Sequence, residues 1–242
     1  MANITPRGLA IRNSPGSRFL RGHSRAWALL AGLSCATAVM AAGGHHALDD
    51  AVILEPGTCQ VESWLTRSDD RQRRLHAGTG CRVGGLEIGV AAEHSRQAGS
   101  GETGYGLQAK WATQLLPGLH AGLSLSTDWQ APVRPRHQGS SLSGLVSWFP
   151  VDDLALHLNL GRDFVRGDAD PDRSGVSVEW TARPGWSITG ERYLEAQTHF
   201  VRAGLRWALS EAWSVDLSRA HRLRGPGEST WTLGATWQFA RP

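Results

Sequence analysis

The sequence predicts an all-β protein: a transmembrane antiparallel β-barrel of about 12 strands, preceded by a cleaved signal peptide. Three observations lead to this prediction. Apolar and polar residues alternate with a period of two in one segment after another from residue 57 onward. The connections between these segments are alternately short and long. After residue 42, no stretch approaches the roughly 18 consecutive apolar residues that a membrane helix needs.

The first 42 residues have the pattern of a secretory signal peptide. Arg21 and Arg25 precede an apolar run over residues 26–42, and small residues follow, so we expect cleavage between residues 41 and 47. Residues 43–56 would then form a periplasmic N-terminal segment, and residues 57–242 the barrel. The alternative, a membrane anchor, is disfavoured because the run is short and no charged stop-transfer flank follows it.

Two cysteines follow the signal peptide, in a compartment that permits disulfides. Cys59 begins an alternating run, residues 68–71 have the composition of a turn, and a second run ends at Cys81. A hairpin centred on Asp70 places Cys59 directly opposite Cys81. This geometry predicts a cross-strand disulfide, with two unpaired thiols as the alternative.

Ten further alternating segments follow this hairpin. The cleanest spans residues 154–161, with four leucines on one face. The ten predicted strands are residues 86–93, 105–115, 119–129, 142–149, 154–163, 176–182, 186–193, 200–209, 213–220 and 230–239.

The connections alternate in length, as the short periplasmic turns and longer outer loops of outer-membrane barrels do. The short ones are residues 82–85, 116–118, 150–153, 183–185 and 210–212, and the longer ones are 94–103, 131–141, 162–174, 195–199 and 221–229.

The composition is compatible with this fold. The mean hydropathy is −0.29, which a membrane barrel tolerates because half of each strand faces a polar lumen. The formal net charge of +3 includes five arginines ahead of the expected cleavage site, so we predict no nucleic-acid partner.

Charged residues fall mainly on the polar face of the predicted strands, where they avoid the roughly 2–4 kcal/mol cost of a lipid-facing Arg or Lys. They could line an aqueous path and set its selectivity. Alternatively, they could pair with one another and brace a plugged interior. The predicted lumen-lining residues are Glu87, Lys110, His120, His157, Glu179, Arg202, Arg206 and Asp216.

The last predicted strand alternates without a break. Trp231, Leu233, Ala235, Trp237 and Phe239 share one face, and polar or small residues occupy the other. The order polar–x–Gly–x–x–aromatic–x–aromatic resembles the insertion signal of bacterial outer-membrane barrels. Here it consists of Thr232, Gly234, Trp237 and Phe239. The resemblance implies a Gram-negative outer membrane, with its lipids and the barrel-assembly machinery as partners.

No catalytic set, metal site or cofactor motif is predicted. His120 and His157 are interpreted as wall residues, because scattered serines and histidines do not define a nucleophile with its base. The carboxylates of Asp168, Asp170 and Asp172 could bind Ca²⁺. An ordinary solvated acidic loop is the preferred interpretation.

Residues 46–62 include the pair Asp49-Asp50, the turn Glu55-Pro56-Gly57 and a first strand with Gln60 and Glu62. This stretch resembles a proteobacterial outer-membrane family described as transporter-like and associated with phenol-degradation pathways. The resemblance implies a porin-like barrel that transports small solutes, including hydrophobic or aromatic compounds. It implies no catalytic residue. A non-conducting scaffold or surface-interaction barrel is the alternative, and a barrel hydrolase is a third possibility.

Overall fold

The computed structural model describes residues 46–131, 133–134, 136–167 and 170–241. The predicted signal peptide, most of its cleavage region, and residues 43–45 lie outside the described residues. The described chain forms twelve strands: β1 (Thr58–Ser68), β2 (Arg73–Val83), β3 (Leu86–Gln97), β4 (Ser100–Leu116), β5 (Leu119–Gln130), β6 (His137–Val151), β7 (Leu154–Val165), β8 (Asp172–Arg183), β9 (Trp186–Glu195), β10 (Thr198–Ala208), β11 (Trp213–Arg224) and β12 (Thr230–Ala240).

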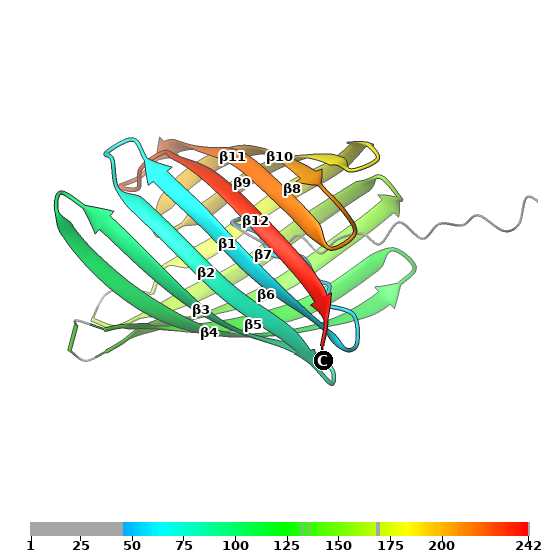
Figure 1. The fold of residues 1–242 in the computed structure, drawn as a ribbon, viewed down its shortest axis with the longest axis horizontal. Coiled ribbons are helices and arrows are strands. Elements are labelled where there is room, and N and C mark those ends of the chain that lie inside the picture. The colour runs from blue at the N-terminus through cyan, green and yellow to red at the C-terminus, as the bar shows by residue number, and fades with distance from the viewer. Residues whose placement is uncertain (1–45, 132, 135, 168–169, 242) are drawn as a thin grey trace, which may run out of the picture. The chain divides into compact units, whose positions relative to one another are not determined.

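The strands close into one antiparallel barrel, in which each strand pairs with its neighbours in the sequence (Figure 1). β1 closes the ring by pairing with β12, with Cys59 opposite Phe239. The predicted fold class is therefore confirmed. Closure leaves no unpaired strand edge. This suits a membrane interior, where the backbone groups of an open edge would lack hydrogen-bond partners.

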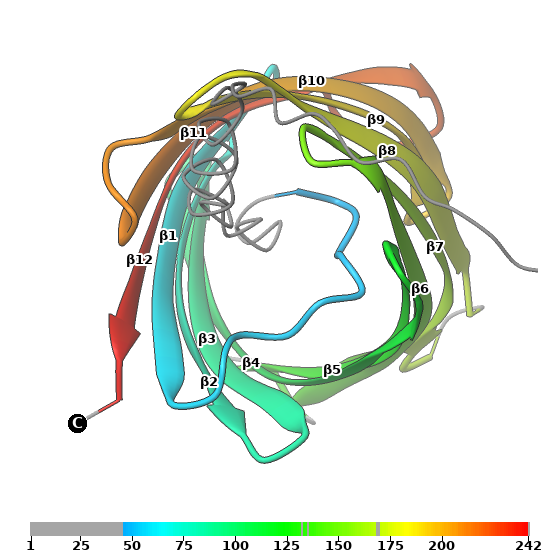
Figure 2. The ribbon, with the colours of Figure 1, turned by 90° about the vertical axis from the view of Figure 1, so that its right-hand side faces the viewer.

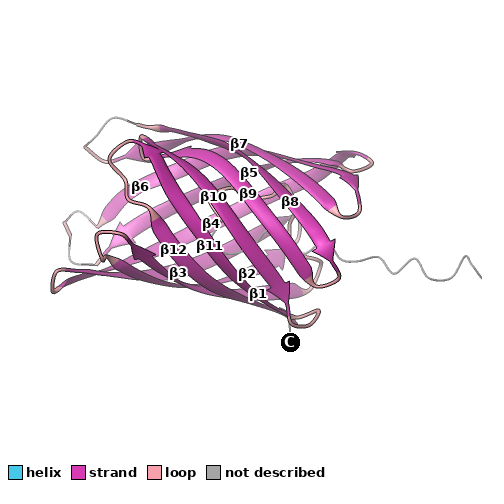
Figure 3. Ribbon diagram, turned by 90° about the horizontal axis from the view of Figure 1, so that it is seen from above, coloured by secondary structure: helices cyan, strands magenta, loops and turns pink. Residues whose placement is uncertain are grey.

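The strands run obliquely across the barrel (Figure 3), and their apolar side chains point outward. Leu123, Leu125, Val176, Leu217 and Leu233 are each about half exposed, whereas the residues between them in each strand face the interior. This apolar outer face suits contact with lipid. No helix among the described residues is long and apolar enough to cross a membrane.

The first hairpin has the predicted register. Cys59 lies opposite Cys81, and the two form a disulfide. The turn between β1 and β2 lies at the opposite end of the barrel from the two barrel termini, because Thr58 pairs with Ala240. The end that carries the termini also has the short turns. In outer-membrane barrels this end faces the periplasm, and we call it the periplasmic end.

At the opposite, outer end, several connections are shorter than the sequence predicts. β3 and β4 meet in a turn at Ala98 and Gly99, with φ values of 49° and 89°, where a loop over 94–103 was expected. Positive φ at both central residues is typical of tight hairpin turns. The strands extend further because backbone pairing continues through polar residues, which carry no alternation signal.

Residues 46–57 lead from inside the ring of strands to the start of β1 (Figure 2). Leu48, Asp50, Ala51 and Leu54 are each at most 4% exposed. We call residues 46–56 the lumen segment. The sequence predicted a periplasmic segment here, and the described part of it lies inside the barrel, enclosed by the strands.

Candidate functional site

The lumen segment contacts the wall first at β3 and β4. The amide of Leu54 donates a hydrogen bond to Glu87 Oε2 at 3.0 Å. Lys110 Nζ donates to Asp49 Oδ1 at 2.9 Å and to Asp50 Oδ1 at 3.1 Å. Lys110 and Asp50 are 5% and 2% exposed, so this ion pair is buried, and removing one charge would leave the other in a poorly solvated site.

A second contact lies at β6 and β7. The amide of Ala51 donates to Ser147 Oγ at 2.8 Å, and Ser147 Oγ also lies 2.7 Å from His157 Nδ1. Ser147 and Ala51 are both 0% exposed. Ser147 therefore anchors the lumen segment. The segment also covers the Ser147 hydroxyl, which a substrate would have to reach if this serine acted as a nucleophile.

The third contact crosses to β9. Glu191, which is 3% exposed, accepts hydrogen bonds from the amides of Ala47 and Leu48 at 3.4 and 3.3 Å. Arg202 lies 3.2 Å from Glu191 and donates to the hydroxyl of Tyr193 at 3.0 Å. Leu48 itself belongs to a small apolar cluster with Tyr193, Phe200 and Ala220.

Beside this contact, β10 and β11 carry a buried ion pair. Arg206 Nε donates to Asp216 Oδ1 at 2.6 Å, and Glu179 lies 4.0 Å from the same guanidinium. The ring of His46 completes the group, with nitrogens 3.8 Å from Glu191 and 4.0 Å from Asp216. Ion pairs and the lumen segment thus fill the lumen on the β9–β11 side.

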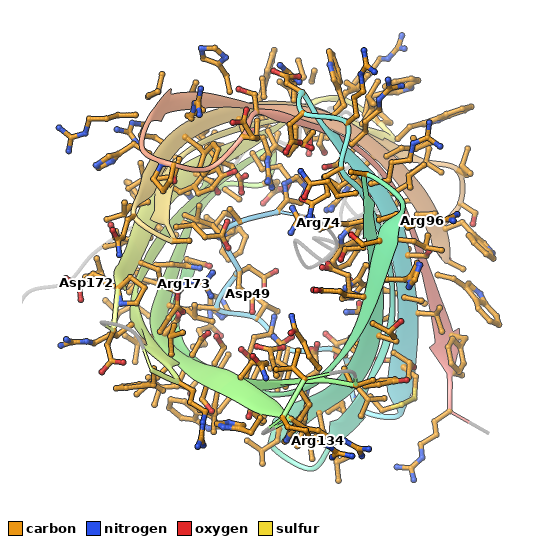
Figure 4. The ribbon with its side chains drawn as sticks, turned by 90° about the vertical axis from the view of Figure 1, so that its left-hand side faces the viewer. Asp49, Arg74, Arg96, Arg134, Asp172 and Arg173 are labelled. Carbon is orange, nitrogen blue, oxygen red and sulfur yellow. A yellow bond between two sulfur atoms is a disulfide. The ribbon has the colours of Figure 1, made fainter. Side chains whose placement is uncertain are left out.

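A hollow lies beside these ion pairs, bounded largely by β1–β5 and reaching β9 at Tyr193 and Glu195. A cavity of about 600 Å³ extends from the lumen segment toward the outer end. On β1 its wall runs from Gln60 to Trp64, and on β4 from Lys110 to Gly104, so both stretches lead away from the periplasmic end. Figure 4, viewed into the barrel, shows Asp49 in the middle of the lumen and Arg173 on the wall. We call this cavity the vestibule.

Carboxylates outnumber cations in the vestibule lining. The acidic lining residues are Asp49, Glu62, Glu87, Glu93, Asp128 and Glu195, and the Lys and Arg residues are Lys110 and Arg173. Lys110 binds Asp49, and Arg173 binds Glu195 at 2.7 Å. The carboxyl groups of the lining therefore outnumber its Lys and Arg side chains.

The structure brings most of the predicted wall residues to the interior, in two groups. Glu87, Lys110 and His157 hold the lumen segment, and Glu179, Arg202, Arg206 and Asp216 form the ion pairs at β8–β11. His120 lies apart from both groups, with its ring edge-on to Phe149 at 5.5 Å between centroids.

The predicted assembly signal lies on β12. Trp237 stacks on Phe239 and on Trp213, with ring centroids 4.6 and 5.6 Å apart. Thr232 is 3% exposed and hydrogen-bonds Thr66 at 3.1 Å, and Gly234 lies opposite Asp216. Recognition of this strand by the assembly machinery stays a prediction.

Sequence reasoning missed the contacts between the lumen segment and the wall, which involve Asp49 and Asp50 of the segment and Ser147 and Glu191 of the wall. One signal was available: the chain has a single lysine, placed on an inner wall, and an Asp-Asp pair just before the first strand. The described residues contain no group of three or more His, Cys, Asp and Glu side chains able to hold a metal ion.

Residues 29–239 match the family described as "Uncharacterised conserved protein UCP029691". The chain belongs to this family. The description names no pathway, so the association with phenol degradation stays a prediction. The sequence has no significant match among curated proteins.

Solved structures with a similar fold are outer-membrane channels. The KdgM porin is 12% identical with a TM-score of 0.59, and the match covers 74% of this chain and 99% of that one. The NanC porin is 9% identical with a TM-score of 0.58, covering 74% and 98%. The toluene transporter TbuX of Ralstonia pickettii is 10% identical with a TM-score of 0.52, covering 77% and 90%. The chain therefore has the fold of bacterial outer-membrane porins and channels.

Proposed function

We propose that this protein is an outer-membrane channel that admits small solutes into the vestibule and regulates their further passage with the lumen segment. The observation that carries the proposal is the 600 Å³ polar cavity enclosed by a barrel whose outer face is apolar. An apolar exterior suits a bilayer, and a solvated charged interior suits a path for polar solutes.

The charge of the vestibule favours neutral or positively charged solutes. A solved KdgM structure contains oligogalacturonate, which is a polyanion. In the present chain, the carboxylates that exceed Lys110 and Arg173 would repel such a molecule. The hydrophobic or aromatic solutes that the resemblance implies have less support, because the lining is rich in carboxylates and amides rather than apolar side chains.

A non-conducting barrel is the second candidate function, and the lumen segment is the observation that favours it. Its amides and carboxylates hydrogen-bond β3, β4, β6 and β9, so the segment spans the lumen. A barrel closed in this way could serve as a scaffold, with its outer turns as the contact surface.

Conductance across a planar bilayer separates the two functions. We expect the Asp49→Asn/Asp50→Asn double variant to conduct more than the wild type, because Lys110 then loses both carboxylates that hold the segment. Glu55→Gln is the matched control, since Glu55 lies on the same segment with an exposed side chain. The absence of current from well-folded preparations of all three proteins would contradict the channel and support the scaffold.

A further inference from the structure

The inner wall of β1–β3 has glycines, and therefore no side chains, at its centre. On β2, Gly78 and Gly80 face the lumen between β1 and β3, and Gly89 lies opposite Gly80 on β3. All three line the vestibule, and none has a positive φ, so the backbone conformation does not demand glycine there. Side chains in these positions would point into the vestibule, and we call the three residues the glycine floor. Gly80 is buried, and Gly78 and Gly89 are partly exposed.

Polar and aromatic side chains surround the glycine floor. Gln60 and Glu62 lie beside it on β1, opposite Gly80 and Gly78. At its outer edge, Trp64 stacks on His76, with ring centroids 3.5 Å apart and planes 6° from parallel. At its inner edge lies the carboxylate of Asp49, which is 26% exposed.

Negative charge is incompletely balanced around the glycine floor. Lys110 binds the carboxylates of Asp49 and Asp50 at 2.9 and 3.1 Å. Glu62 accepts a hydrogen bond from Gln60 Nε2, and Glu87 accepts one from the Leu54 amide. These two donors are uncharged, so the site can accommodate an additional positive charge.

An independent observation points to a missing hydrogen-bond donor. Gln60 is 8% exposed, and its Nε2 donates to Glu62 Oε1 at 3.1 Å. Its Oε1 has no hydrogen-bond partner among the described residues. A buried amide oxygen without a donor is costly, and Gln60 lines the vestibule. A ligand that carries N–H groups would supply the donor.

We propose that the vestibule binds a small organic cation over the glycine floor. The ammonium group lies between Glu62 and Asp49 and within reach of Gln60 Oε1, and the planar part of the ligand lies against the Trp64–His76 pair. Carboxylates provide charge-assisted acceptors for an ammonium, and a tryptophan ring attracts cations. The inference deepens the proposed function by naming a solute class, and it rests on the same vestibule.

Calorimetric titration of the folded, detergent-solubilised protein tests this proposal with benzylammonium, benzyl alcohol and benzoate as probes. These probes share a ring and differ in charge. We expect benzylammonium to bind at least about tenfold more tightly than the other two, since a charge-assisted hydrogen bond accounts for that difference. Equal binding of the alcohol, or no binding of benzylammonium, would overturn the proposal.

Variants locate the site. Glu62→Gln keeps the shape and removes the charge, and we expect it to weaken benzylammonium binding by about tenfold. Gly78→Val fills the floor and should weaken all binding there. Glu211→Gln, in the exposed β10–β11 turn, is the charge-matched control and should bind as the wild type does. Unchanged binding by both site variants, in preparations whose heat-dependent gel mobility shows a folded barrel, would contradict the assignment.

Binding and conduction are measured separately, so the two proposals can fail separately. A barrel that carries current and binds no benzylammonium contradicts only the assignment of the solute class. A barrel that binds benzylammonium and carries no current, even in the Asp49→Asn/Asp50→Asn variant, contradicts the channel.

Discussion

The two sides of the lumen are built differently. Around β9–β11, ion pairs, the Tyr193–Phe200 stack and Leu48 occupy the interior. Around β1–β5, glycines and small residues leave a cavity, and carboxylates lack an equal number of cations. One closed ring of strands therefore contains a braced side, where ion pairs fill the interior, and an open side, which can admit a solute. Charged inner-wall residues therefore form ion pairs that fill the interior on one side of this barrel and line a cavity on the other.

The largest expected difference between the two sides concerns stability. Arg206→Ala leaves Asp216, which is 3% exposed, without its guanidinium partner, and should destabilise the fold by about 3–5 kcal/mol. Ser126→Ala, on the open side, should change stability by no more than about 0.5 kcal/mol. Denaturant unfolding of the refolded barrels measures both. Similar losses for the two variants would contradict the distinction.

The disulfide strengthens the open side, where the lumen has fewer ion pairs. Cys59 and Cys81 are 22 residues apart, and closing a loop of that length is worth about 3 kcal/mol by chain entropy. The Cys59→Ser/Cys81→Ser double variant should lose stability of that order in the same unfolding experiment. A wild-type protein whose unfolding midpoint is insensitive to reductant would show that the bridge adds nothing.

A matched glycine pair compares the free space on the two sides. An added Cβ at Gly80 would lie 3.6 Å from Glu87 Oε1, an ordinary contact, so Gly80→Ala should be neutral or stabilising by about 0.5 kcal/mol. At Gly175, a Cβ would lie 2.8 Å from Leu48 Cδ1 of the lumen segment and 2.7 Å from Tyr193 Cβ.

Gly175→Ala should therefore destabilise by about 1–3 kcal/mol, the usual range for overpacking. It should also loosen the lumen segment and raise conductance, whereas Gly80→Ala should leave the segment in place. Equal stability and equal conductance of the two variants would mean that the braced side can accommodate a Cβ at Gly175 without displacing Leu48 or Tyr193.

The smallest effect concerns an ion pair outside the membrane-spanning region. Arg219 donates two hydrogen bonds to Asp69 in the β1–β2 turn, at 2.9 and 2.8 Å. These hydrogen bonds and the guanidinium charge lower the pKa of the Asp69 carboxyl below its ordinary value.

A lowered pKa in the folded state gives stability that is present above the unfolded pKa and is lost as the pH falls through the folded pKa. Arg219→Gln should therefore raise the pKa of Asp69, and the stability difference from the wild type should be small and vanish in acid. Carboxyl chemical shifts recorded against pH measure the change. An identical titration of Asp69 in both proteins would contradict the pairing.

Much of the fold could be predicted from the sequence, because the alternation of apolar and polar residues within a strand shows which of its faces is apolar. The leucines of residues 154–160 alternate with polar or small residues, and Cys59 and Cys81 are equally spaced about a single turn at Asp70. The structure confirms the barrel and the disulfide. The outer strand ends could not be predicted, because pairing such as Arg96 opposite Gly101 continues where both faces are polar.

The organisation of the lumen could not be predicted for a different reason. The contact between the Leu48 amide and Glu191 joins residues 143 positions apart, and it leaves no periodic pattern. Gly78 and Gly80 lie in β2 and Gly89 in β3, and only the strand register places Gly89 opposite Gly80. The sequence showed charged inner walls, and the structure shows which charges meet: Arg206 with Asp216 on adjacent strands, and Lys110 with Asp49 of the lumen segment.

The most direct test of an open, outward-facing vestibule is the labelling of a single cysteine in intact cells. Ala91 lines the vestibule between Gly78 and Gly106, and Ala91→Cys adds only a thiol there while Cys59 and Cys81 remain bridged. We predict that a membrane-impermeant trimethylammonium thiosulfonate added outside modifies this variant, faster than its sulfonate analogue does, and leaves the parent protein unmodified. Protection of the thiol in intact cells, with full reaction after unfolding, would show that the vestibule is closed to the outside and would contradict the account.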